Sequence, residues 1–228
     1  MSEEFYRIKR LPPYVFAEVN RLKADYRSKG VDIIDFGMGN PDMDTPQHIV
    51  NKLIETVKKP RTHRYSASRG INGLRKAQAQ YYKNRFDVLL DPEKEIIATL
   101  GSKEGLANLA MAITAPGDVM LVPNPSYPIH PYGFMIAGGT LRHVPTLHNG
   151  TFDPEEYMRS LTRSVSHSVP KPVAVVVSFP SNPTAQLCDL DFYEEIVAFA
   201  KKHELWLLSD LAYAEIYFDE MRFILSNQ

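Results

Sequence analysis

The segment Val173–Phe179 is a nearly continuous run of apolar side chains, most of them β-branched. Such a run indicates a strand covered on both faces, because a strand with one wet face alternates polar and apolar residues. The later segment Leu190–His203 has the spacing of an amphipathic helix, and Leu205–Ser209 has the pattern of a second apolar strand. Strands that alternate with helices build βαβ units. The expected fold class is therefore α/β, with a mainly parallel sheet and helices on both faces.

This alternation begins near residue 95 and predicts further strands and helices. The strands are expected at Glu95–Leu100, Asp118–Val122 and Thr140–Val144, and the helices at Lys103–Ala115, within Ser126–Ala137 and at Pro154–Arg163. The Ser-rich segment Thr162–Lys171 is expected to be a loop. Upstream, periodic apolar residues predict helices over Val15–Tyr26, after Pro46 and from about Asn72 to Phe86.

Composition and charge exclude several classes of protein. With 44% hydrophobic and 23% charged residues, the 228-residue chain has the composition of a globular domain. Its 26 basic and 27 acidic residues give no general attraction to nucleic acid or to an anionic membrane. The single cysteine, Cys188, allows neither an internal disulfide nor a cysteine metal cluster. With no apolar run long enough to span a bilayer, we expect a cytoplasmic protein without a metal.

Four predicted strands end in polar residues, and ligands of open parallel sheets bind beyond these carboxyl ends. The four segments are Gly101–Gly105, Pro123–Pro128, Ser181–Thr184 and Ser209–Tyr213. Gly101–Gly105 opens a helix, where backbone N–H groups and the helix dipole favour a phosphate and Ser102 adds a hydroxyl. A plain N-cap by Ser102 is the alternative.

Taken singly, the other positions allow two interpretations each. Asp210 ends an apolar strand, where a carboxylate needs a partner. Either it pairs with a cationic heterocyclic nitrogen, or it caps a helix. Tyr127 is a stacking platform or a packed aromatic residue, and Asn182-Pro183 is a ligand-binding corner or an ordinary turn. The sequence contains neither G-x-x-x-x-G-K-[ST] nor a strand followed by G-x-G-x-x-G, so a P-loop or a dinucleotide fold is not supported.

Together, these motifs resemble the class I/II, fold type I pyridoxal-phosphate aminotransferases. The matching segments are Leu11–Phe16, Phe36–Asp42, Tyr65–Arg75, Gly101–Leu106, Pro123–Pro128, Ser181–Thr184 and Asp210–Tyr213. The chain is most similar to the alanine (glutamate–pyruvate) transaminases and to diaminopimelate aminotransferases. The resemblance implies an N-terminal arm of the small domain over residues 1–45. It implies an incomplete cofactor-binding major domain over 46–219, and it leaves a tail over 220–228 unplaced.

The resemblance also implies roles for residues around pyridoxal phosphate. Ser102 and Lys103 hold the cofactor phosphate, and Tyr127 stacks on the pyridine ring. Asp210 pairs with the pyridine nitrogen and keeps it protonated, which makes the ring an electron sink.

Further implied contacts complete the cofactor site and the substrate site. Asn182 and Tyr213 hydrogen-bond the phenolic oxygen of the cofactor. Tyr65 reaches the cofactor phosphate of a partner subunit, so the active unit is expected to be a homodimer. Gly39 lines the pocket for the substrate carboxylate, and Tyr14 closes over the substrate.

The implied reaction moves an amino group between an L-amino acid, alanine- or glutamate-like, and a 2-oxo acid. The resemblance places the Schiff-base lysine beyond Gln228, and the last lysine of the chain is Lys202. No catalytic residue is therefore assigned, and a truncated, frameshifted or partial chain with little activity of its own is expected. The neighbour of the strand at Glu95–Leu100 also falls beyond the chain, so this strand is expected to expose unpaired backbone groups.

Three alternatives to this function stay open at the level of sequence. In the first, the chain is a non-catalytic remnant that binds the cofactor or caps a full-length subunit. In the second, the chain serves another fold type I chemistry. A regulator that joins this fold to a DNA-reading domain is disfavoured by the balanced charge and by an N-terminus that the aminotransferase arm already occupies.

Overall fold

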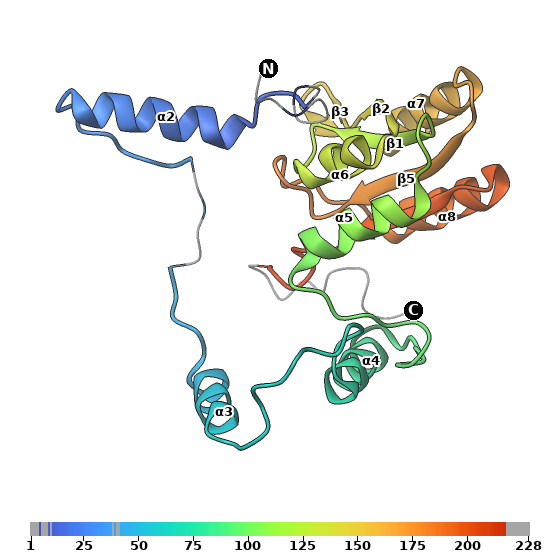
Figure 1. The fold of residues 1–228 in the computed structure, drawn as a ribbon. Coiled ribbons are helices and arrows are strands. Elements are labelled where there is room, and N and C mark those ends of the chain that lie inside the picture. Colours follow the sequence, from blue (N-terminus) through green and yellow to red (C-terminus); the bar gives the residue numbers. More distant parts are fainter. Residues whose placement is uncertain (1–4, 6–8, 10, 38, 40–41, 218–228) are drawn as a thin grey trace. The chain divides into compact units, whose positions relative to one another are not determined.

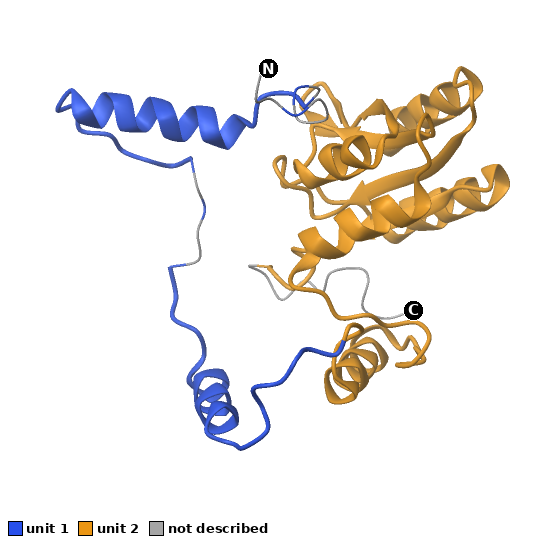
Figure 2. Ribbon diagram, viewed as in Figure 1, with its two compact units in different colours: residues 1–67 blue, residues 68–228 orange. Residues whose placement is uncertain are grey.

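The computed structural model describes residues 5, 9, 11–37, 39 and 42–217 (Figure 1). The chain forms two compact units, residues 1–67 and 68–228 (Figure 2). The domain boundaries expected from the sequence stay a prediction. The segment 220–228 lies outside the described residues, as do Met38, Asn40 and Pro41 of the Gly-rich corner.

The smaller unit contains two described helices, α2 (Val15–Ser28) and α3 (Gln47–Val57). Both confirm the helices expected from apolar periodicity, and neither has a buried side chain within the described chain. The apolar segment after α2 has no regular secondary structure, and an ion pair of 2.9 Å between Lys23 Nζ and Asp35 Oδ2 connects it to the helix.

The larger unit is built on a four-stranded parallel sheet in the order β2-β1-β5-β6. Its strands are β1 (Val119–Asn124), β2 (Thr140–Pro145), β5 (Pro172–Ser178) and β6 (Trp206–Asp210). β1 pairs with both β2 and β5, and β5 pairs with β6. The α/β class and the parallel sheet are therefore confirmed. β5 is central and almost fully buried, as its apolar run predicts.

Helices cover both faces of this sheet (Figure 1). They are α5 (Ser102–Ile113), α6 (Ile129–Ala137), α7 (Pro154–Ser166) and α8 (Leu190–His203), and α4 (Asn72–Phe86) precedes them. Alternate residues of β1 and β5 point to opposite faces, as strand geometry requires. Leu121 and Val175 pack with α7 and α8, whereas Met120 and Val176 pack with α5 and α6. The result is two cores separated by one sheet.

The ends of α7 and α8 follow from their capping residues. Asp153 accepts a hydrogen bond from the backbone N–H of Glu156, and Asp189 accepts one from that of Phe192. α7 continues to Ser166, so the predicted loop at Thr162–Lys171 is wrong over its first half. The reason is packing, because Val165 contacts the core beside α7 and extends the apolar face by one turn.

A short hairpin that the sequence analysis missed follows β2. Its strands are β3 (Leu147–His148) and β4 (Thr151–Phe152), and they pair in antiparallel fashion. Asn149 and Gly150 form the connection with φ angles of +50° and +88°. Two positive φ angles are typical of a type I′ turn, for which Asn-Gly is the preferred pair.

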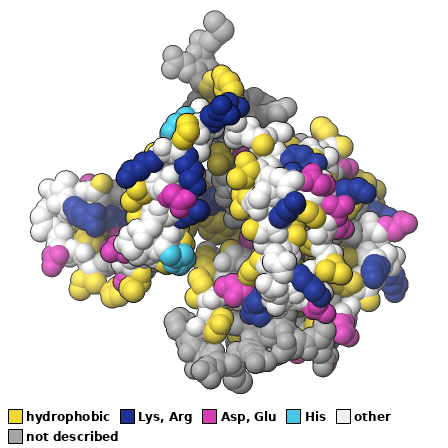
Figure 3. All heavy atoms as spheres, turned by 90° about the horizontal axis from the view of Figure 1, so that it is seen from below, with side chains coloured by type: hydrophobic (Ala, Val, Ile, Leu, Met, Phe, Trp, Pro, Cys, Tyr) yellow, Lys and Arg dark blue, Asp and Glu magenta, His cyan; other side chains and the backbone are white. Residues whose placement is uncertain are grey.

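The predicted strand at Glu95–Leu100 is wrong, because this segment is irregular and pairs with no described strand. Ala98 donates its backbone N–H to Arg69 O at 3.1 Å, and Ile97 and Leu100 are 62% and 92% exposed. A strand needs a neighbour to satisfy its backbone groups. The apolar residues of this segment therefore join the many exposed apolar side chains of the surface (Figure 3).

Over the described residues, no helix combines the length and the apolar character that crossing a bilayer requires.

Candidate functional site

Asp210, the last residue of β6, lies at the carboxyl end of the sheet beside Ser178 of β5. Its Oδ2 accepts a hydrogen bond from His130 Nε2 at 2.9 Å, and its Oδ1 accepts one from the backbone N–H of Ala212 at 3.1 Å. The hydrogen bond from His130 is the main cause that lowers the pKa of Asp210, although partial burial acts in the opposite direction. Asp210 is therefore an ionised carboxylate with a fixed orientation, and it caps no described helix.

The sequence analysis did not single out His130, the partner of Asp210. It is the second residue of α6, and its side chain is fully buried. The backbone N–H of His130 donates to Tyr127 O at 3.0 Å, which fixes the start of the helix against the turn after β1. A titratable residue in an otherwise apolar helix was the available signal, because such a group needs a partner when buried.

Asn182 and Tyr213 come together although 31 positions separate them in the sequence. Asn182 Nδ2 donates a hydrogen bond to Tyr213 Oη at 2.9 Å. Asn182 follows β5 and Tyr213 follows β6, so the pairing of these two strands places both side chains at one edge. The sequence analysis assigned both residues to a single cofactor atom, and their contact is compatible with that assignment.

Lys103 and Tyr127 also meet at this edge. Lys103 Nζ lies 5.3 Å from the centroid of the Tyr127 ring, within the range of a cation–π contact. The Tyr127 ring lies in turn 6.3 Å from the His130 ring, at an interplanar angle of 75°. Contacts therefore connect Lys103, Tyr127, His130 and Asp210, which come from α5, the turn after β1, α6 and β6.

Ser102 is the first residue of α5, and Gly101 occupies the N-cap position. Ser102 is therefore not the cap, so the plain-cap alternative fails. Gly101 has a φ of +87°, which glycine adopts without strain, and no described atom lies within 4 Å of where a Cβ would stand. The start of α5 is thus uncrowded at Gly101, next to Lys103, and the backbone N–H groups of a helix start favour a phosphate.

The remaining predicted site residues belong to the smaller unit. Tyr14 holds the N-cap position of α2 and is half exposed, and its ring centroid lies 5.5 Å from that of Phe16. Tyr65 is fully exposed. At Gly39, no described atom stands within 4 Å of an added Cβ. The roles of Tyr14, Gly39 and Tyr65 stay predictions.

Comparison with known proteins identifies the class. The model of the family "Aminotransferase class I and II" matches residues 31–227, and the chain belongs to this family.

Relatives and solved structures agree. The chain is 61% identical to the putative aminotransferase AatC of Rhizobium meliloti (strain 1021), over 96% of the chain and 53% of that protein. It is 51% identical to the glutamate-pyruvate aminotransferase AlaC of Escherichia coli (strain K12), over 96% of the chain and 52% of that protein. A single mutant of Thermus thermophilus aspartate aminotransferase matches with a TM-score of 0.84 and 30% identity, over 99% of the chain and 57% of that structure. The chain thus spans about half the length of the proteins it matches.

Proposed function

We propose that the chain carries the cofactor-binding part of a pyridoxal-phosphate-dependent aminotransferase, which transfers an amino group between an alanine- or glutamate-like L-amino acid and a 2-oxo acid. The observation that carries the proposal is the pairing of a buried histidine with an ionised aspartate at the carboxyl edge of a parallel sheet. Family membership supports the reaction class, and the name of the glutamate-pyruvate aminotransferase AlaC supports the substrates.

The residues of the larger unit fit this cofactor. Asp210 is a half-buried anion, and a cationic ring nitrogen is the partner that such a group favours. When bound, the cofactor supplies a protonated pyridine ring that withdraws electrons from the reacting carbon of the amino acid. Asp210 holds the proton on the ring nitrogen, and His130 keeps Asp210 ionised and oriented.

The other residues bind the two ends of the cofactor. Ser102 and Lys103, with the first turn of α5, hold the phosphate dianion. Tyr127 stacks on the ring, and the Asn182–Tyr213 pair hydrogen-bonds the phenolic oxygen. These groups orient the cofactor and keep water from its ring.

The smaller unit supplies the contacts to the substrate and to the partner subunit. Tyr65 reaches the cofactor phosphate of a second copy in a cytoplasmic homodimer. Gly39 lines the pocket for the substrate carboxylate, and Tyr14 closes over the substrate.

On this proposal, the 228 residues alone have little or no transaminase activity. The resemblance places the Schiff-base lysine after Tyr213, and no lysine follows Lys202 in the sequence. Free amines in solution do not replace it, because a positioned base acts at an effective concentration that a solute cannot reach.

Binding of pyridoxal phosphate to the purified chain tests the proposal. The single tryptophan, Trp206, lies on β6 and reports binding through quenching of its fluorescence. We expect saturable quenching, and we expect Asp210→Asn to weaken binding by about tenfold or more, since a hydrogen bond to a charged group contributes ~1.5–3 kcal/mol.

Asp191→Asn is the matched control, because Asp191 is an exposed residue in the first turn of α8. This variant should bind like the unmodified chain. Circular dichroism and size-exclusion chromatography establish that each variant is folded. Quenching that does not saturate in a folded chain contradicts the proposal, and so does equal affinity for the Asp210→Asn variant.

A further inference from the structure

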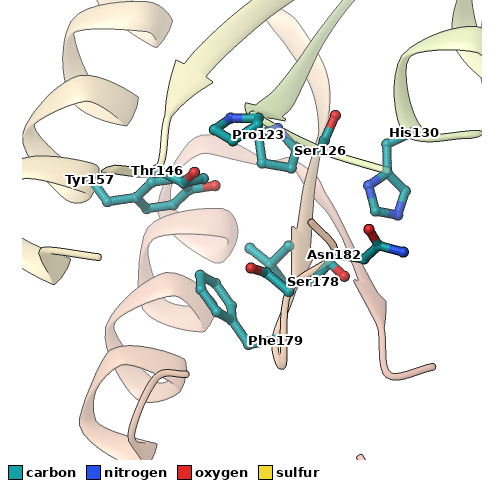
Figure 4. A pocket seen from close by; sticks show the side chains of 11 residues that line it. Pro123, Ser126, His130, Thr146, Tyr157, Ser178, Phe179 and Asn182 are labelled. Carbon is teal, nitrogen blue, oxygen red and sulfur yellow. The ribbon is translucent and has the colours of Figure 1, made fainter. Parts of the chain in front are cut away.

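A small pocket lies where β1 and β5 end, beside His130. Six of the residues that line it are Pro123, Ser126, His130, Thr146, Ser178 and Asn182. Figure 4 shows His130 and Asn182 at one end of the pocket and Tyr157 with Thr146 at the other. The space open to the centre of a water molecule is about 10 Å³, which is close to the volume that one water requires.

The two ring nitrogens of His130 have different surroundings. Nε2 contacts Asp210, whereas Nδ1 is buried and has no hydrogen-bond partner among the described residues. His130 is one of the residues that line the pocket, and Asp210 is not. A buried nitrogen without a partner destabilises a fold, and such groups are commonly satisfied by an ordered water.

The tautomer of His130 follows from its partner. Asp210 is ionised and can only accept, so the proton of the His130–Asp210 hydrogen bond is on Nε2. In a neutral imidazole, Nδ1 then has a free lone pair and needs a donor.

A molecule that donates a hydrogen bond to Nδ1 can form its other hydrogen bonds with hydroxyl groups of the pocket. Ser126 and Ser178 line the pocket, and the hydroxyl of neither forms a hydrogen bond with another described residue. Thr146 also lines the pocket, at the end opposite His130 (Figure 4), and its Oγ1 donates to Asn124 O at 3.2 Å.

We propose that this pocket binds one water molecule, which donates a hydrogen bond to Nδ1 of His130 and is held by the serine hydroxyls of the pocket. The water fixes the imidazole in the tautomer that gives its Nε2 proton to Asp210. Ser178 is thus a positioning residue that acts on Asp210 through the water and His130. The inference rests on atoms of this chain and holds with or without a cofactor.

Nuclear magnetic resonance of the ¹⁵N-labelled chain tests the inference directly. Among the seven histidines, the signals of His130 are identified by their loss in His130→Gln. We expect Nε2 to carry the proton and Nδ1 to show the shift of a hydrogen-bonded acceptor. We also expect a nuclear Overhauser effect between the Hε1 proton of His130 and a long-lived water.

Ser178→Val fills the pocket with methyl groups and should remove both the water signal and the acceptor shift of Nδ1. Ser166→Val makes the same change on the exposed end of α7 and should leave both signals unchanged. A protonated Nδ1, a missing water signal in the unmodified chain, or a water signal that survives in Ser178→Val overturns the proposal. The first two outcomes are read in the unmodified chain and need no Ser178 variant, so the test does not depend on whether Ser178→Val folds.

Discussion

Replacing Glu215 by alanine should loosen the turn that carries Tyr213. Glu215 Oε1 accepts hydrogen bonds from Tyr81 Oη at 2.5 Å and from Arg85 Nε at 2.9 Å, and both donors lie on α4. Glu215 is thus a clamp that attaches the segment after β6 to a helix 130 or more positions earlier in the sequence.

The size of the effect follows from the exposure of the clamp. The side chains of Arg85 and Glu215 are 24% and 47% exposed, so solvent screens the ion pair and it contributes ~0.5 kcal/mol. The hydrogen bond from Tyr81 to a partly exposed carboxylate adds ~1 kcal/mol. A loss of ~1.5 kcal/mol raises the population of the open turn about tenfold.

Amide hydrogen exchange measures that population. The backbone N–H groups of Ala214 and Ile216 donate within the turn, at 3.1 Å to Leu211 O and at 3.0 Å to Tyr213 O. Their protection should fall about tenfold in Glu215→Ala. Glu18→Ala, which breaks the exposed Glu18–Arg21 pair of α2, is the control and should not affect them. Unchanged protection in Glu215→Ala refutes the reasoning.

The clamp should also depend on pH. The hydrogen bond from Tyr81 lowers the pKa of Glu215, opposed by burial and assisted by Arg85. A lowered pKa gives stability that is present above the unfolded value of ~4.3 and is lost as the pH falls through the folded value. Partial burial and the bond to Glu215 raise the pKa of Tyr81 to about 12, so its share is lost as the pH rises from ~10 toward 12. Protection of the turn should therefore be greatest between these limits.

Three further changes probe other parts of the structure. Leu161→Ala removes a fully buried side chain from the core under α7 and should lower the free energy of unfolding by ~3–5 kcal/mol, measured by urea denaturation; a loss below ~1 kcal/mol would contradict that packing. Gly70→Ala should cost at least ~1–2 kcal/mol in the same assay, because Gly70 has a φ of +85° and an added Cβ collides with Ala98; an unchanged midpoint would be inconsistent with this geometry. Burial raises the pKa of Cys188 to about 12, so at pH 7 this thiol should react with a disulfide reagent far more slowly in the native chain than in urea, and equal rates would argue against its burial.

The sequence predicts best those elements whose capping residues and apolar pattern lie within the element or directly next to it. Leu190–His203 is a helix with the predicted bounds, because Asp189 caps it and its apolar residues repeat at helical spacing. The central strand β5 was predicted within one residue at each end, since burial on both faces leaves a continuous apolar run.

The errors arise where structure depends on distant partners. Glu95–Leu100 has the composition of a strand, yet no described strand pairs with it, and local composition does not reveal that the segment is irregular without its neighbour. The residues of the candidate site on α5, at the end of β6 and after β5 were predicted from strand ends and from the family resemblance. His130 was missed because its contact with Asp210 spans 80 positions, and a titratable residue in an apolar helix does not by itself identify such a distant partner.

The order of the strands in space has a consequence for synthesis on the ribosome. β1 and β2 are neighbours in both sequence and space, so they can pair early, whereas β5 lies between β1 and β6. Until Pro172–Ser178 has left the exit tunnel, one edge of β1 stays unpaired and the core beneath α7 lacks the side chains of its central strand, β5. The nascent chain thus exposes apolar surface and an unpaired strand edge for the time taken to translate about fifty residues. In this interval the chain is most prone to aggregate and most in need of a chaperone.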